Sequence, residues 1–181
     1  MEDEIHYTLM NTAKEFTKQS NCIRAERKVA AIAARDGKII LIAANGTNDN
    51  SCATRGYCIR KKMNIESGTA PGWDWCLHAE QRLVCTAARK GISLYGTTVY
   101  VTHRPCLICT KLLSESGVAQ VFFDIDYPDE MAKIYAEKNN LNIQQLMSAE
   151  MQAEADEGNA ETSDTTLSES EPQEQQETPQ Q

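Results

Sequence analysis

The second half of this 181-residue chain alternates between helix-like and strand-like segments. Residues 97–102 (TTVYVT) and 118–125 are rich in β-branched and aromatic residues, which favour strands. Strong helix formers fill residues 78–90, and Gly91 would cap that helix at its C-terminus. Further helices are expected over 106–116, behind Pro105, and over 128–138, while 141–146 fits either a last strand or a helix extension. This order predicts an α/β fold in which helices cover both faces of a mixed sheet.

The first half adds one helix and a hairpin to this pattern. Over residues 4–20, apolar side chains recur at intervals of three or four and would form one face of a helix: Ile5, Leu9, Ala13 and Phe16. Short apolar runs at 28–35 and 38–44 flank Asp36-Gly37, a dipeptide that favours a tight turn between antiparallel strands. Together with the second half, this predicts a three-layer α/β/α domain whose mixed sheet has about five strands.

An irregular segment follows Asn45-Gly46 and separates the hairpin from the helix at 78–90. It is about 30 residues long, rich in Gly, Asn, Ser, Thr and Cys, and shows little periodicity. A loop of this length inside a compact domain is unusual. We therefore expect it to carry a function or to be held by an internal cross-link.

Acidic residues are concentrated at the C-terminus. The net charge is −8, but residues 149–181 contain ten Asp or Glu and no Lys or Arg, so residues 1–148 carry +2. The C-terminal segment has no aromatic residue and few large apolar ones, so it cannot bury enough apolar area to offset chain entropy. We expect a folded domain at 1–147 and an acidic disordered tail at 148–181, which either only solvates the protein or docks a partner.

The composition also bounds the location and the partners. The first ten residues do not resemble a signal peptide, and no apolar run approaches the length of about 20 residues that spans a bilayer. These features predict a cytoplasmic protein with no membrane association. Seven cysteines then favour metal binding or reduced thiols over disulfides. A charge of +2 over 148 residues lacks the strong positive charge that a nucleic-acid substrate would require.

Two short motifs carry the chemistry, His78-Ala79-Glu80 and Pro105-Cys106-Leu107-Ile108-Cys109. Each is expected to open a helix, so both would direct backbone N–H groups into one cleft. His78, Cys106 and Cys109 supply one imidazole and two thiolates, a ligand set that zinc prefers and that leaves a fourth position for water. Zinc lowers the pKa of that water towards neutrality and so supplies hydroxide. The motifs therefore predict a catalytic zinc site.

Glu80 is expected to move protons at this site. It lies two residues after a ligand, close enough to reach the zinc-bound water without joining the coordination shell. A carboxylate there can take the proton of the water, deliver it to a ring nitrogen and pass one to departing ammonia. The order HxE, 24 further residues, then PCxxC matches the signature of zinc nucleobase deaminases. The alternatives are a structural zinc knot and a non-catalytic zinc-scaffolded binding protein, for which Glu80 would be unnecessary.

A longer set of motifs resembles one family. Asn45-Gly46, Cys58-Ile59-Arg60, Ser67-Gly68, HAEQ and GTTVYVTHRPCLICTKLL are similar to deoxycytidylate (dCMP) deaminases, especially the bacterial competence-operon type, over about residues 4–146. The resemblance implies the cytidine deaminase fold, a catalytic zinc, hydrolysis of dCMP to dUMP and ammonia, and a homo-oligomer. Other substrates stay open: another cytosine nucleoside or nucleotide, or another nucleobase.

The resemblance also implies roles for further residues. Asn45 would contact the sugar of the nucleotide, and Ala79 is assigned to the substrate side of the site. Some phage and bacterial dCMP deaminases hold a second, structural zinc near the long loop. This implies a four-cysteine site of Cys22, Cys52, Cys58 and Cys76, with unpaired reduced thiols as the alternative.

Several residues are assigned from their chemistry alone. A nucleotide phosphate needs cationic or N–H partners, so Arg27 and Arg60 are candidates among the basic residues near the expected cleft. Tyr127 either stacks on the base or packs in the core. His103 is expected beside the site without binding metal, and Cys85 is expected in the core because it lies in a helix among apolar residues.

Overall fold

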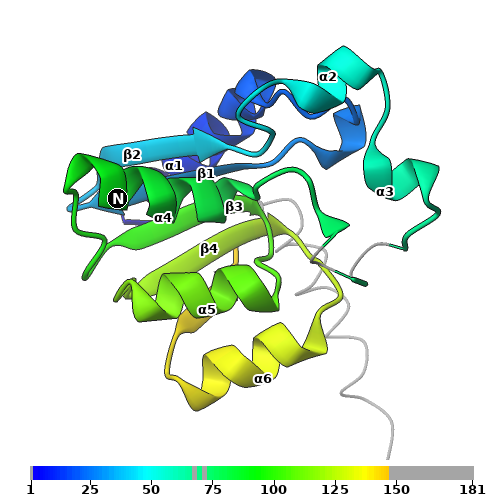
Figure 1. The fold of residues 1–181 in the computed structure, drawn as a ribbon. Coiled ribbons are helices and arrows are strands. Elements are labelled where there is room, and N and C mark those ends of the chain that lie inside the picture. The colour runs from blue at the N-terminus through cyan, green and yellow to red at the C-terminus, as the bar shows by residue number, and fades with distance from the viewer. Residues whose placement is uncertain (1, 67–68, 71–72, 147–181) are drawn as a thin grey trace, which may run out of the picture. The chain divides into compact units, whose positions relative to one another are not determined.

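The computed structural model describes residues 2–66, 69–70 and 73–146 and confirms the predicted mixed sheet. Five strands lie in the order β2-β1-β3-β4-β5 (Figure 1). Strand β1 pairs antiparallel with both β2 and β3, whereas β3, β4 and β5 run parallel. The strand bounds are β1 Ala30–Arg35, β2 Lys38–Ala44, β3 Thr98–His103, β4 Gln120–Ile125 and β5 Asn142–Gln145.

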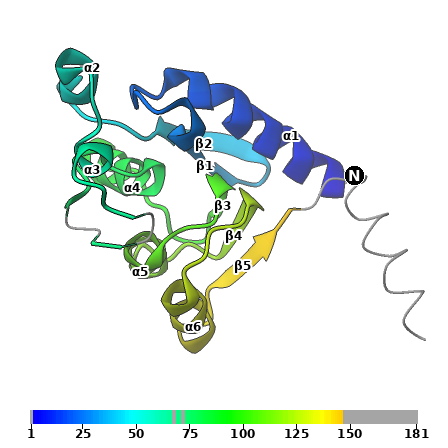
Figure 2. The ribbon, with the colours of Figure 1, turned by 90° about the vertical axis from the view of Figure 1, so that its right-hand side faces the viewer.

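Helices cover both faces of the sheet, as the sequence predicts. Helix α1 (Glu2–Phe16) lies on one face, and α4 (Ala79–Lys90), α5 (Leu107–Glu115) and α6 (Glu130–Lys138) lie on the other (Figure 2). Alternate residues of β1 show the division, because Ala31 and Ala33 pack in the cluster that includes Leu83 of α4. Ile32 packs instead against Leu9 and its neighbours on α1. The domain is therefore a three-layer α/β/α structure.

The turn between β1 and β2 has the geometry that Asp36-Gly37 favours. Both residues have positive φ angles, 51° and 71°, and the strands pair up to Arg35 and Lys38 on either side of them. Glycine adopts such angles without steric cost, and aspartate tolerates them. The hairpin prediction is confirmed.

The helix that carries His78 is capped as expected, since Gly91 ends α4 with a φ of 66°. The starts of α5 and α6 differ slightly from the prediction. Cys106 and Asp129 are their N-caps, so each preceding proline, at 105 and 128, lies just outside its helix. The segment after Leu141 forms a strand, which decides between the two alternatives.

The long segment after Gly46 is less irregular than predicted. It contains two short helices, α2 (Ser51–Arg55) and α3 (Ile59–Lys62). Two 3-10 turns, Thr17–Gln19 and Ala25–Arg27, lie earlier in the chain, between α1 and β1. Paired backbone hydrogen bonds between Gly46 and Leu77, at 3.0 and 2.9 Å, close the segment at its base. Gly46 has a φ of +149°, and a Cβ atom there would lie 1.8 Å from Asn21 Oδ1. Only glycine fits this junction.

The expected core position of Cys85 is wrong, because the residue is exposed. The buried residues of α4 include Ala79, Leu83 and Ala87, spaced by four. Cys85 lies two residues from Leu83, which places it on the opposite side of the helix. Among the described residues, no helix has the length and apolar content needed to cross a membrane. The tail expected at 148–181 lies outside the described residues.

Candidate active site

The three predicted zinc ligands meet between the starts of two helices. His78 is the N-cap of α4, Cys106 is the N-cap of α5, and Cys109 lies in the first turn of α5. His78 Nδ1 lies 3.5 Å from Cys106 Sγ and 3.4 Å from Cys109 Sγ. All three ligand atoms lie within 4.8 Å of one another. Residues 28 or more positions apart are thus brought to one point, as the sequence predicts.

These distances suit a tetrahedral zinc ion. Zn–N bonds of about 2.0 Å and Zn–S bonds of about 2.3 Å, at tetrahedral angles, separate nitrogen and sulfur by about 3.5 Å. One of the two thiols is also prepared to ionise. A hydrogen bond from Cys109 lowers the pKa of Cys106 to about 4, while the same interaction and burial raise the pKa of Cys109. The donor set therefore fits a three-ligand zinc site.

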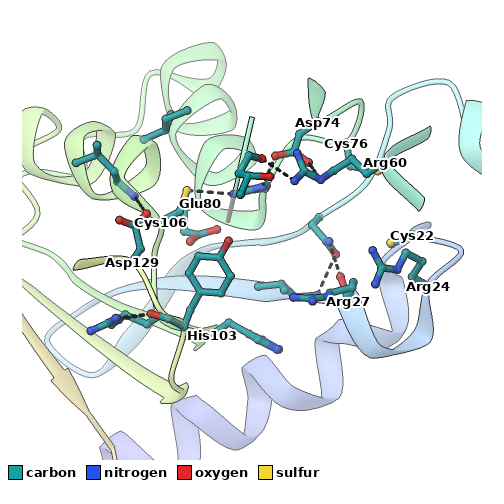
Figure 3. Close-up of a pocket in the computed structure, with 18 of the residues that line it drawn as sticks. Cys22, Arg24, Arg27, Arg60, Asp74, Cys76, Glu80, His103, Cys106 and Asp129 are labelled. Carbon is teal, nitrogen blue, oxygen red and sulfur yellow. Dashed lines mark hydrogen bonds and ion pairs between the residues drawn. The ribbon is translucent and has the colours of Figure 1, made fainter. Parts of the chain in front are cut away.

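Glu80 lies beside the ligands and is 4% exposed. Burial raises its pKa, and the neighbouring His78 partly opposes the shift. A carboxyl group whose pKa is moved towards neutrality can both accept and release protons near pH 7. Glu80 and Cys106 face the same cavity of about 480 Å³ (Figure 3). The cavity therefore places a buried carboxyl group next to side chains that could hold a metal ion.

This arrangement agrees with the comparison to known protein families. The model of the cytidine and deoxycytidylate deaminase zinc-binding region matches residues 3–125. The chain belongs to the cytidine and deoxycytidylate deaminase family. Its members are hydrolytic deaminases, so the expectation of an enzyme is confirmed.

Individual relatives are similar over most of the domain. The chain is 26% identical over 147 residues to a deoxycytidylate deaminase of Enterobacteria phage T2, covering 64% of this chain and 77% of the relative. It is 28% identical to ComE operon protein 2 of Bacillus subtilis, covering 74% of this chain and 66% of the relative. A dCMP deaminase of cyanophage S-TIM5, solved with dCMP and dUMP, superposes with a TM-score of 0.61 at 25% identity. It covers 80% of this chain and 98% of the phage chain.

Asn45 of this deaminase lines the cavity and is 8% exposed. Its Oδ1 accepts hydrogen bonds from Ser20 Oγ at 2.6 Å and from the Val29 backbone N–H at 2.9 Å. Its Nδ2 donates to the Arg27 carbonyl at 2.7 Å. Most of its hydrogen-bonding capacity therefore holds three segments together at the edge of the cavity.

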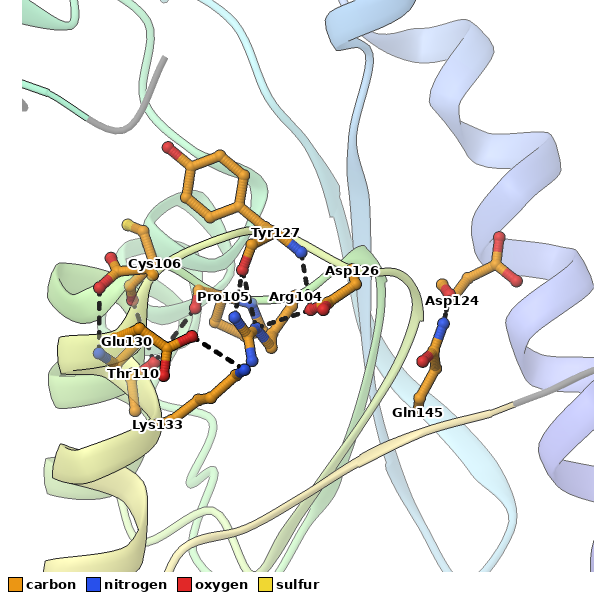
Figure 4. A network of polar contacts seen from close by, with 12 residues as sticks. Arg104, Pro105, Cys106, Thr110, Asp124, Asp126, Tyr127, Glu130, Lys133 and Gln145 are labelled. Atoms are coloured by element: carbon orange, nitrogen blue, oxygen red, sulfur yellow. Dashed lines mark hydrogen bonds and ion pairs between the residues drawn. The ribbon is translucent and has the colours of Figure 1, made fainter. Parts of the chain in front are cut away.

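Arg27 and Tyr127 also line the cavity, whereas Ala79 does not. The Ala79 side chain is fully buried against the sheet, so only its backbone could reach a ligand. The carbonyl of Tyr127 accepts hydrogen bonds from the Arg104 guanidinium, which also forms a 2.9 Å ion pair with Asp126 (Figure 4). This network fixes the backbone at Tyr127.

The predicted cysteine site is only partly assembled. Cys52 Sγ lies 3.8 Å from Cys76 Sγ, and a hydrogen bond with Cys76 lowers the pKa of Cys22 to about 6. Cys58 lines the same cavity as Cys22 and Cys76. However, the group of His78, Cys106 and Cys109 is the only one in the described part of the chain whose ligand atoms are close enough to share a metal. Cys76 contacts Cys22 and Cys52, and Cys58 shares only the cavity, so the four cysteines do not form a closed site.

The other two histidines, His6 and His103, lie outside the cluster of metal ligands. His103 lines the cavity, and burial together with nearby Arg27 lowers its pKa. His6 Nδ1 is 2.6 Å from Tyr100 Oη, between α1 and the sheet. Neither belongs to the metal-ligand group found in the described residues.

Two aspartates in the site were missed by sequence reasoning. Asp129 Oδ2 accepts a hydrogen bond from the Leu107 N–H at 2.9 Å, and its Oδ1 accepts one from the Ala132 N–H at 3.0 Å. It therefore caps α6 and also holds the start of α5, next to Cys106. Asp74 lies 3.6 Å from the Nε2 atom of His78. An aspartate one residue before a helix was a readable cap signal, but no sequence pattern gave the other contacts.

Proposed function

We propose that this deaminase hydrolyses dCMP to dUMP and ammonia, with zinc held by His78, Cys106 and Cys109. The observation that carries the proposal is the meeting of these three ligands beside buried Glu80, which lines one cavity together with His78 and Cys106. The similarity to phage dCMP deaminases, one of them solved with dCMP and dUMP, supports the choice of substrate.

Glu80 carries the proton transfers in this proposal. Zinc held by the three ligands would lower the pKa of a water molecule, so that hydroxide is available at neutral pH to attack a ring carbon. Glu80 accepts one proton from the attacking water and delivers it to the ring nitrogen N3. It then transfers the second proton to the departing amine, so that a C–O bond replaces the C–N bond and ammonia leaves. Its raised pKa suits both directions of transfer.

We assign the substrate contacts to residues that line the cavity. An amide nitrogen carries two hydrogens, and the bond to the Arg27 carbonyl uses one, so Asn45 keeps a donor for the nucleotide sugar. Arg27 is assigned to the phosphate and Tyr127 to the base. Arg60 is not retained for the phosphate, because its guanidinium is already bonded to Asp74 and to the carbonyls of residues 66, 69 and 70.

A substrate panel tests this function. Ammonia release is measured with dCMP, CMP, deoxycytidine, cytosine, dCTP and adenosine at equal concentration. The proposal expects dCMP to have the highest kcat/KM. Activity confined to unphosphorylated nucleosides would assign the enzyme to cytidine deamination, and activity on adenosine alone would assign it to another nucleobase.

A second, structural zinc bound by Cys22, Cys52, Cys58 and Cys76 is part of the proposal. The 3.8 Å distance between the sulfurs of Cys52 and Cys76 and the hydrogen bond between Cys22 and Cys76 support it. A closed thiolate site would cross-link the segment that contains α2 and α3. Metal analysis is expected to give two zinc ions per chain, and one after Cys52→Ser. One zinc in both proteins would contradict the second site.

The remaining proposals concern the state of the protein in the cell. By similarity to its family, the enzyme is proposed to form a homo-oligomer in the cytoplasm and to act on a free nucleotide rather than a nucleic acid. Light scattering of the purified protein tests the first point, since a mass of about 20 kDa, that of one chain, would contradict it.

A further inference from the structure

His78 presents its two ring nitrogens to different partners. Nδ1 faces the thiols of Cys106 and Cys109, while Nε2 lies 3.6 Å from Asp74 Oδ2. A histidine that binds metal through one nitrogen carries a proton on the other, and that proton needs an acceptor. Asp74 is the carboxylate in place to receive it. This contact lies outside the cluster of ligands.

Asp74 is itself held in place by an ion pair with Arg60. Its other oxygen, Oδ1, lies 3.2 Å from Arg60 Nε, and the Arg60 side chain is only 13% exposed. The rest of the guanidinium donates to three backbone carbonyls, of Ala70 at 3.0 Å and of Glu66 and Thr69 at 2.6 Å each. Arg60 therefore has almost no freedom to move, and Figure 3 shows it directed at Asp74.

The backbone of His78 is fixed separately from its ring. Gln81 Oε1 accepts a hydrogen bond from the His78 N–H at 2.9 Å, which anchors the start of α4. The orientation of the imidazole about its side-chain bonds is left to its ring contacts. Among these, Asp74 is the contact opposite the thiols.

We infer that Asp74, held by Arg60, is a positioning residue that orients the His78 ring for zinc binding. The inference rests on the proposed zinc function. The order is Arg60, Asp74, His78 and then the metal, so Arg60 reaches His78 through Asp74. The contact also joins the segment that carries α3 to the catalytic centre. A carboxylate behind a ligating histidine fixes its tautomer, and losing it typically costs about 10- to 100-fold in metal affinity or activity.

The test compares Asp74→Asn with a matched control, Asp124→Asn. Asp124 forms an ion pair with Lys14 at 2.7 Å, and its side chain is 24% exposed, close to the 25% of Asp74. It lies on β4 and is not a contact of His78. Zinc affinity is measured by competition with a chromophoric chelator, and dCMP turnover is measured on zinc-loaded protein. Circular dichroism verifies that each variant is folded.

Asp74→Asn is expected to weaken zinc binding by about 10- to 100-fold and to lower kcat, with the KM for dCMP within about twofold of wild type. Asp124→Asn is expected to leave both unchanged. Arg60→Gln should give a smaller loss, and the double variant should match Asp74→Asn alone, because the two residues act in series.

Two results overturn the inference while the proposed function stands. One is wild-type zinc affinity in Asp74→Asn, and the other is a double variant whose losses multiply. A wild-type protein that binds no zinc would overturn the proposed function and the inference together.

Discussion

Replacing Asp129 by alanine tests how the start of α5 is held. The carboxylate accepts one hydrogen bond at the N-terminus of α6 and one from Leu107 at the N-terminus of α5. Losing an N-cap costs about 1 kcal/mol, and a typical further hydrogen bond contributes about 1 kcal/mol. We expect Asp129→Ala to lower the free energy of unfolding by about 2 kcal/mol.

Urea denaturation followed by circular dichroism measures this change. Asp129→Asn keeps one acceptor oxygen but turns an amide NH₂ towards the second N–H, so it should lose about half as much, about 1 kcal/mol. Glu130→Gln is the control, because that exposed residue forms only a surface ion pair with Lys133 and should change stability by less than about 0.5 kcal/mol. An unfolding free energy of Asp129→Ala equal to that of the control would refute the idea that Asp129 stabilises the starts of both α5 and α6.

Four further substitutions test the fold. Leu83→Ala should cost about 2 to 5 kcal/mol of stability because Leu83 is fully buried. Cys85→Ser, on the exposed face of the same helix, should change stability by less than about 0.5 kcal/mol. Equal losses in urea denaturation would contradict this assignment of the buried and exposed faces of α4. Gly46→Ala should destabilise by at least about 1 kcal/mol, because its Cβ would collide with Asn21, and an unchanged melting temperature would contradict this. Burial raises the pKa of Tyr100 from 10.0 to about 12, so between these values the unfolded chain loses the phenol proton first and stability falls as pH rises. Tyr100→Phe should reduce that alkaline slope in pH-dependent melting experiments, and an identical slope would show that another group causes it.

The elements that sequence predicts well are those set by local chemistry. Asp36-Gly37 specifies its turn through backbone angles that few residues adopt, and Gly91 ends α4 for the same reason. The three ligands and Glu80 were predicted because their residue types and spacing are set by the metal and the proton transfer. The order of strands was not predicted, since pairing of β1 with β3 depends on contacts far apart in the chain.

The remaining errors arise where tertiary contacts decide the structure. Helices α2 and α3 span five and four residues and are too short to form without packing. They are also too short to show a helical pattern of apolar residues in the sequence. Arg60 was a candidate for the phosphate because a sequence cannot tell a free guanidinium from one bonded to carbonyls and to Asp74. Cys85 has apolar neighbours along the chain, which suggest a core position, but burial depends on the helical face, and Cys85 lies on the exposed one.

The central claim is that Glu80 transfers protons beside a metal held by His78, Cys106 and Cys109. The most direct test is Glu80→Gln, which preserves the size of the side chain and removes only its proton chemistry. Zinc content and ammonia release from dCMP are measured on the same preparations. The account predicts the zinc content of wild type and a loss of turnover of about 10²- to 10⁴-fold. Turnover near the wild-type rate with zinc in place would contradict it.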